Sequence, residues 1–237
     1  MGFYTLDKEE LTLPEFVTKY GNSYYTDQPR YIPRVGQSSR AVEDTIDDLL
    51  KNGIKKPENV VQILAWKLGK IKHLESEDHF VYAQDWKNAE QFEVYRYNQE
   101  FDIKTVAEYV VGNITRLEKE ADTDPQKVIC ELRDLQIKGL GTVYLITLLY
   151  FISRGKYPIY DRFAMMAVQA ICENKMPGDC VAISELPEKN SHTFQTVFED
   201  YMIPFIKKLE DIFGAAYQES RDIDRALWVY GHAFHVK

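Results

Sequence analysis

Length, composition and charge set the first limits. The chain has 237 residues, 45% of them hydrophobic and 28% charged, which is enough to bury one large core or two lobes. A formal net charge of −8 argues against a protein that coats nucleic acid through a diffuse basic surface, so any DNA contact must be local. No stretch is apolar enough for a membrane helix and the first residues lack signal-peptide order, so we expect a cytoplasmic or nucleoid-associated protein without membrane contact.

Periodic apolar residues predict helices along most of the chain, and the fold class is therefore all-α. The predicted helices cover residues 41–50 (after Ser38 and Ser39, before Gly53), 57–71 (opened by Pro57), 103–117, 125–135 (after Asp124, ended by Gly139), 194–212 (bent at Pro204) and 223–234. Only residues 92–97 alternate as a strand would.

The segment from Lys138 to Phe163 combines a glycine turn, a long apolar run and an aspartate. Residues 142–152 are apolar or weakly polar throughout, too long for an ordinary buried strand, and a helix that is apolar all round is buried all round. The local order is thus a helix, a glycine turn at Gly139 and Gly141, a buried helix, a short loop, and Asp161 at the start of another helix.

This order resembles the helix-hairpin-helix DNA glycosylase superfamily, the enzymes of the endonuclease III, adenine glycosylase and 8-oxoguanine glycosylase type. The residues that carry the resemblance are Leu132, Leu135, Gly139, Leu140, Gly141, the loop 155–158 and Asp161. The resemblance implies one glycosylase-like unit over 1–237 with two lobes, about 1–100 plus 190–237 and about 101–189. The hairpin 132–152 would lie in the second lobe, and Asp161 at a cleft between the lobes.

One position departs from the family pattern. The family's catalytic aspartate follows its lysine nucleophile by eighteen residues, and at that distance before Asp161 stands Val143. The resemblance therefore implies a monofunctional glycosylase, a lysine from elsewhere in the chain, or a descendant that has lost catalysis. Arg162 and Phe163 replace the Thr-His common in the endonuclease III branch, which leaves the subfamily open.

Physical chemistry supports a local DNA contact. Glycines let a backbone approach a phosphate closely, and the helix that follows presents unpaired N–H groups and a partial positive charge. We expect double-stranded DNA as the partner, held through its phosphates by Lys138, Gly139, Leu140, Gly141 and Thr142. Positive charge gathers around this segment in Lys138, Arg154, Lys156 and Arg162.

An ionised carboxylate at a helix start can stabilise the oxocarbenium-like sugar that forms when an N-glycosidic bond breaks, and Asp161 is the predicted catalytic residue. The base must be flipped out and stacked, and we assign Val143, Trp228 and His232 to its pocket. Each assignment has a structural alternative: Asp161 as a helix cap, the glycines as helix terminators and Trp228 as core. Whole-protein alternatives are a non-catalytic DNA-binding module and a helical protein with an accidental resemblance.

No metal or cofactor is expected. The three cysteines, Cys130, Cys172 and Cys180, lack the CxxC spacing of a zinc ribbon. A site formed by Cys172, Cys180 and His192 would have no evident fourth ligand. The four-cysteine loop that carries the iron–sulfur cluster of the endonuclease III branch is absent.

Overall fold

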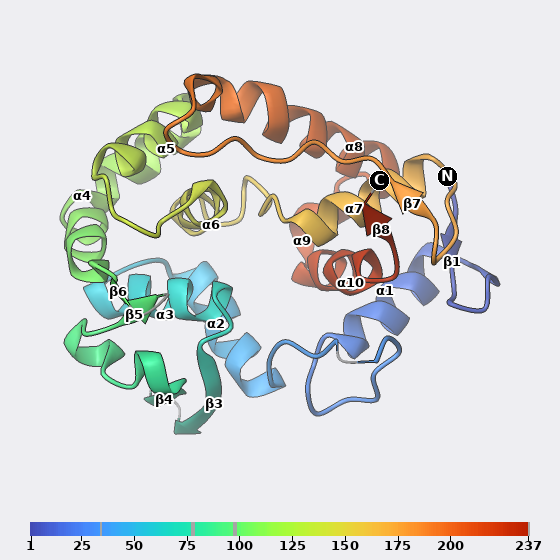
Figure 1. The fold of residues 1–237 in the computed structure, drawn as a ribbon, viewed down its shortest axis with the longest axis horizontal. Helices are drawn as coiled ribbons and strands as arrows, with labels where there is room; N and C mark the ends of the chain where they lie inside the picture. The colour runs from blue at the N-terminus through green and yellow to red at the C-terminus, as the bar shows by residue number, and fades with distance from the viewer. Residues whose placement is uncertain (34, 77–78, 97–98, 237) are drawn as a thin grey trace. The chain divides into compact units, whose positions relative to one another are not determined.

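The computed structural model describes residues 1–33, 35–76, 79–96 and 99–236 and is helical, which confirms the all-α prediction (Figure 1). The helices are α1 (Leu13–Ser23), α2 (Arg40–Asn52), α3 (Pro57–Lys67), α4 (Ile103–Thr123), α5 (Pro125–Asp134), α6 (Thr142–Ile152), α7 (Arg162–Cys172), α8 (Ile203–Phe213), α9 (Ala216–Glu219) and α10 (Arg221–Gly231). In the described part of the chain, no helix combines the length and apolar character needed to cross a bilayer.

The strands are short and pair two by two. Three pairs are antiparallel: β1 (Phe3–Tyr4) with β2 (Glu10–Leu11), β3 (Ile71–Ser76) with β4 (His79–Tyr82), and β5 (Tyr95–Arg96) with β6 (Gln99–Glu100). β7 (Cys180–Val181) runs parallel to β8 (His235–Val236) near the C-terminus. Each of these described ribbons has two strands and does not form a layer of the fold, so the core is formed mainly by the helices.

The chain forms two compact units. Unit 1 comprises residues 1–37, 158–186 and 199–237, and unit 2 comprises residues 38–157 and 187–198. These bounds differ from the predicted lobes, because residues 38–100 cluster with 101–157 and residues 158–186 cluster with the two ends of the chain. The physical reason is helix packing: α3 contacts α4 and α6, while α7 contacts α10.

Unit 2 is built around α6, which contacts α3, α4 and α5 (Figure 1). Every residue from Leu145 to Ile152 is buried, as the sequence predicts for a helix apolar on all sides. The ring of Trp66 on α3 meets that of Phe151 on α6 with centroids 6.0 Å apart. The indole N–H of Trp66 donates to the buried carboxylate of Glu43 on α2 at 2.7 Å, which joins a third helix to this core.

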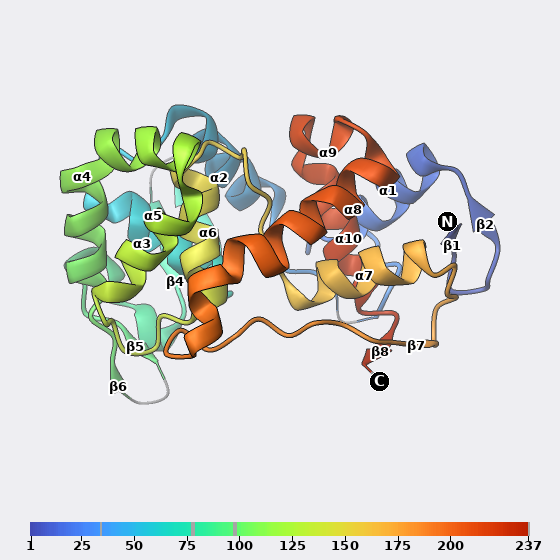
Figure 2. The ribbon, with the colours of Figure 1, turned by 90° about the horizontal axis from the view of Figure 1, so that it is seen from above.

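Unit 1 packs α10 against both α1 and α7 (Figure 2). Rings from two of these helices fill the interface: Phe16 and Tyr20 on α1 have centroids 5.2 and 4.8 Å from that of Tyr230 on α10. On the other side, Gly231 lies so close to α7 that an added Cβ would stand 1.9 Å from the carbonyl oxygen of Phe163. Only glycine fits this contact.

Several predicted helix ends are confirmed by their caps. The Ser39 side chain accepts from the N–H of Val42 at the start of α2, and Gly53 ends that helix with φ 76°. Asp124 caps α5 by accepting from the N–H of Lys127 at 3.0 Å.

Other boundaries were predicted wrongly. The helix 57–71 ends at Lys67, and Gly69 with φ 64° turns the chain into β3, where Ile71 pairs with Tyr82. α5 ends at Asp134, one residue before the predicted end, and the helix is stopped at Gln136, which has a left-handed φ of 55°, rather than by Gly139. The last helix ends at Gly231, before Phe234.

The predicted helix 194–212 is in fact three segments. A 3-10 helix (His192–Thr196) and a π-helical segment (Phe198–Met202) precede α8. Pro204 lies in the first turn of α8, where its missing N–H and its ring prevent a continuous α-helix through residue 200. In the predicted strand 92–97, β5 occupies Tyr95–Arg96, and residue 97 lies outside the described residues. The sequence analysis missed α1 and the β3–β4 ribbon.

Candidate functional site

The α5–α6 loop, residues 135–141, contains four of the five predicted phosphate-binding residues and lies in unit 2; the fifth, Thr142, begins α6. Lys138 and Gly139 are exposed, and Gly139 adopts a left-handed φ of 85° that favours glycine. The Leu140 side chain between the glycines is only 2% exposed, so it anchors the loop in the core. The loop thus shows its backbone and one lysine to solvent while an apolar side chain fixes it.

The start of α6, which follows the loop directly, presents backbone N–H donors. Gly141 is its N-cap and carries no side chain, and its carbonyl accepts from the N–H of Tyr144 at 3.0 Å. A Cβ added to Gly141 would meet nothing within 4 Å, so the space beside this backbone is open. The Tyr144 N–H is used in the bond to Gly141, whereas Thr142 and Val143 come too early in α6 for their N–H groups to reach an acceptor one turn back in the helix, and they lie at the positive end of its dipole.

Two of the predicted site residues are limited, one by a hydrogen bond and the other by its side-chain type. The Thr142 side chain is buried and its hydroxyl donates to the carbonyl oxygen of Pro187 at 2.5 Å, so this hydroxyl is already used within unit 2. Val143 is half-buried on the first turn of α6 and has no amine, so it cannot form a Schiff base.

The basic character of the segment is weaker than the sequence count indicates. Arg154 donates to Glu118 at 2.7 Å and to the carbonyl of Lys51, and Lys156 pairs with Asp122 at 2.9 Å. These two cations are therefore already bound within unit 2. Lys138 has no side-chain hydrogen bond or ion pair among the residues that the structure describes.

The predicted catalytic residue lies in unit 1, at the first turn of α7. Asp161 is the N-cap of that helix, half-buried, and its Oδ1 accepts from the backbone N–H of Phe163 at 2.9 Å. The cap explains why the helix begins here. It also fixes one carboxylate oxygen while the side chain remains partly accessible.

Three rings contact one another beside the first turn of α7, and the charge of Asp161 acts on one of them, His232. The imidazole of His232 stacks on the phenyl ring of Phe163 with centroids 3.5 Å apart and an interplanar angle of 16°. Trp228 lies edge-on to His232 at 4.4 Å and to Phe163 at 6.0 Å. All three side chains are half-buried. We call Asp161, Phe163, Trp228 and His232 the Asp161 cluster.

The neutral ring of His232 is held in one tautomer. Its Nδ1 lies 2.8 Å from the carbonyl oxygen of Trp228, and because a carbonyl only accepts, Nδ1 carries the proton in the neutral ring. Burial lowers the pKa of His232, while the Trp228 carbonyl and the charge of Asp161 partly oppose that shift. The imidazole is thus a neutral, stacked ring near neutral pH.

The predicted site residues therefore fall into two groups. Asp161, Trp228 and His232 are brought together in unit 1, and residues 138–143, of which Leu140 and Thr142 are buried, lie in unit 2. Two residues of these regions were not among the predicted site residues. The ring of Phe163 stacks on His232, and the Nζ of Lys189 donates to the carbonyl of Ile137 at 2.6 Å. Nothing local in the sequence marks either residue, because each meets its partner across more than fifty positions of the chain.

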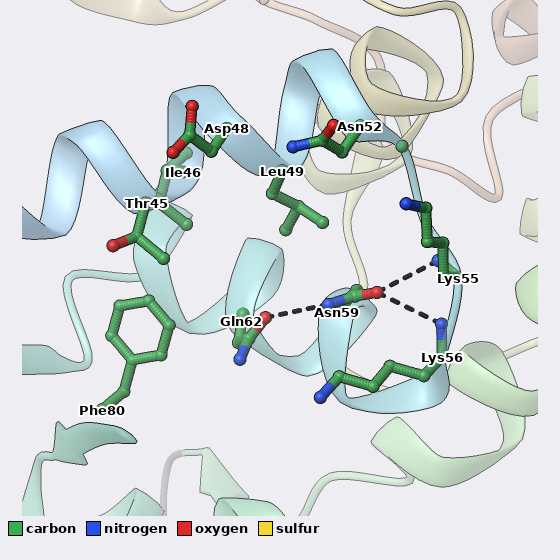
Figure 3. Close-up of a pocket in the computed structure, with 11 residues that line it drawn as sticks. Thr45, Ile46, Asp48, Leu49, Asn52, Lys55, Lys56, Asn59, Gln62 and Phe80 are labelled. Atoms are coloured by element: carbon green, nitrogen blue, oxygen red, sulfur yellow. Dashed lines mark hydrogen bonds between the residues drawn. The ribbon is translucent and has the colours of Figure 1, made fainter. Parts of the chain in front are cut away.

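A separate pocket in unit 2 lies between α2 and α3 (Figure 3). Its amide groups are used by the fold: Asn59 accepts from the N–H groups of Lys55 and Lys56 at 3.0 and 3.1 Å and donates to Gln62 at 3.1 Å (Figure 3). These bonds close the turn that leads into α3. Among the described residues, no three His, Cys, Asp or Glu side chains are grouped as a metal site would require.

Comparisons of the chain with models of protein families, with curated proteins and with solved structures found no match in any of the three.

Proposed function

We propose that this chain is a DNA-base glycosylase that releases a damaged or mismatched base from duplex DNA. The observation that carries the proposal is the Asp161 cluster, in which a carboxylate and three partly accessible rings meet although their sequence positions are 161–163 and 228–232. A carboxylate beside a stacking surface is what excision of a flipped base requires.

In this proposal Asp161 faces the sugar of the flipped nucleotide. Breaking the N-glycosidic bond builds positive charge on the sugar, which the carboxylate stabilises while it orients a water molecule. Water adds to the sugar carbon as the base leaves, and the proton of the water goes to the departing base. Because Val143 has no amine, the reaction ends at the abasic site without strand cleavage.

The α5–α6 loop supplies the grip on the DNA backbone. Lys138 contributes a charge, Gly139 is exposed, Gly141 leaves open space beside the backbone, and the first turn of α6 contributes N–H donors. Such contacts carry no sequence information, so they suit an enzyme that must hold any duplex around a lesion.

The test is a screen of purified protein against duplexes that each contain one oxidised, alkylated, deaminated or mismatched base. Alkali or heat then reveals abasic sites as strand breaks. We expect at least one product, and Asp161→Asn should abolish it while duplex binding stays within about twofold. Asparagine caps a helix as well as aspartate does, so this variant removes the charge and keeps the fold. Full activity of Asp161→Asn would contradict the proposed role.

A second candidate is a non-catalytic DNA-binding protein. It is favoured by the cap itself, since the bond from Phe163 to Asp161 explains this carboxylate without any chemistry. This candidate predicts salt-sensitive duplex binding, weakened by Lys138→Ala, and no product from any lesion. If the wild-type protein fails to bind duplex DNA even at low salt, both candidates are wrong.

A further inference from the structure

The α5–α6 loop is held from both sides by a segment far away in the sequence. Pro187 accepts from the hydroxyl of Thr142, just after the loop, at 2.5 Å. Lys189 donates to the carbonyl oxygen of Ile137, in the first half of the loop, at 2.6 Å. We call residues 187–189 the bridging segment. Both of its bonds lie within unit 2, and together they fix the two arms of the loop relative to each other.

Lys189 is an unusual choice for a structural donor. Its side chain is half-buried, and burial lowers its pKa, so the ammonium loses hydration in this position. It has no carboxylate partner among the described residues, and its one protein hydrogen bond goes to a neutral carbonyl. A neutral donor would hold that carbonyl without the cost of desolvating a charge.

The ammonium has further capacity at this place. A lysine carries three N–H donors, and the Ile137 carbonyl takes one of them. The loop it touches also carries the exposed Lys138, while Arg154 and Lys156 are bound to acidic side chains elsewhere in unit 2. The loop therefore carries one exposed lysine and is contacted by a second, Lys189, whose ammonium the fold holds at the Ile137 carbonyl.

We propose that Lys189 is a second phosphate-binding residue of the α5–α6 loop, which donates to the Ile137 carbonyl and to a DNA phosphate oxygen at the same time. This inference rests on the proposed function. It adds a residue from a distant segment to the predicted set 138–142, and it gives the bridging segment a role in binding besides its role in holding the loop.

The experiment measures duplex binding as a function of salt for the wild type, Lys138→Met, Lys189→Met, Lys189→Gln and Lys189→Arg. Each phosphate contact contributes about 0.9 to the slope of log affinity against log salt concentration. We expect Lys138→Met and Lys189→Met each to reduce the slope by about 0.9, and Lys189→Arg to keep it. Lys189→Gln retains a neutral hydrogen-bond donor but no charge, so it should also reduce the slope by about 0.9. Lys72→Met, which removes an exposed lysine on β3, is the charge-matched control and should leave the slope unchanged.

The outcomes separate the two proposals. If the wild type binds and Lys138→Met lowers the slope while Lys189→Met and Lys189→Gln keep it, Lys189 is structural only and the inference is wrong. If Lys189→Gln lowers the affinity but leaves the slope unchanged, the inference is also wrong. A distorted loop would make fewer hydrogen bonds to DNA, but the number of counterions released from the phosphates would stay the same. If the wild type does not bind duplex DNA at low salt, the proposed function fails and Lys189 has no phosphate to bind.

Discussion

The α5–α6 loop of unit 2 and the Asp161 cluster of unit 1 are assembled in different ways. The features of the loop belong to neighbouring residues in the sequence: a glycine with a left-handed φ, an exposed lysine and the start of a helix. The cluster joins the first turn of α7 to the last turns of α10, and its central feature is a ring stack between Phe163 and His232. A backbone site can be read from a short motif, whereas a side-chain site depends on how two helices pack.

The packing contact at Gly231 is the most direct way to break the cluster without touching the loop. In Gly231→Ala the new methyl group would overlap the carbonyl oxygen of Phe163, so α10 and α7 must move apart. We expect a loss of about 3 kcal/mol in the free energy of unfolding, at the upper end for overpacking. Urea denaturation measures it.

The matched control for that change is Gly141→Ala, where an added Cβ meets nothing within 4 Å and φ is −87°. It should lower the free energy of unfolding by about 1 kcal/mol or less, because alanine is a poorer N-cap than glycine but no atoms overlap. Equal stability of the two variants would show that α7 and α10 are not as close as the Phe163 contact requires.

The bond between Thr142 and the bridging segment offers a smaller test on the side of the loop. Thr142→Val leaves the Pro187 carbonyl without its donor, and we expect a loss of about 1 kcal/mol. Thr147→Val is the control in the same helix, because among the described residues the Thr147 hydroxyl bonds to the carbonyl of Val143 one turn earlier and to no distant segment. That variant should lose about 0.5 kcal/mol or less. Equal losses in the two variants would mean that the long-range bond does not stabilise unit 2.

The contrast between the two regions also explains what the sequence could predict. The bounds of α6, the caps at Ser39 and Asp124 and the place of Asp161 were predictable, because apolar period and cap chemistry are local. The break of 194–212 into three segments was only partly predictable, since Pro204 signals a bend but not a π-helical turn before it. The partners of Phe163 and Lys189 depend on tertiary packing, so no local pattern marks them.

The subtlest effect concerns the charge of His232. Burial lowers its pKa below the ordinary 6.5, so the folded protein resists a proton that the unfolded chain accepts. The stability that depends on the neutral ring is fully present above about pH 6.5 and declines as the pH falls below that value. We expect the wild type to lose unfolding free energy relative to His232→Gln between pH 8 and pH 5, as measured by urea denaturation at each pH.

The same histidine reports on the carboxylate beside it. The negative charge of Asp161 raises the pKa of His232 and so opposes the effect of burial. Asp161→Asn keeps the cap on α7 but removes that charge, and the NMR titration midpoint of His232 should therefore move further down. An unchanged midpoint would mean that the charge of the Asp161 carboxylate does not affect the pKa of His232. In that case Asp161 would serve α7 alone, and the electrostatic link within the Asp161 cluster would be lost.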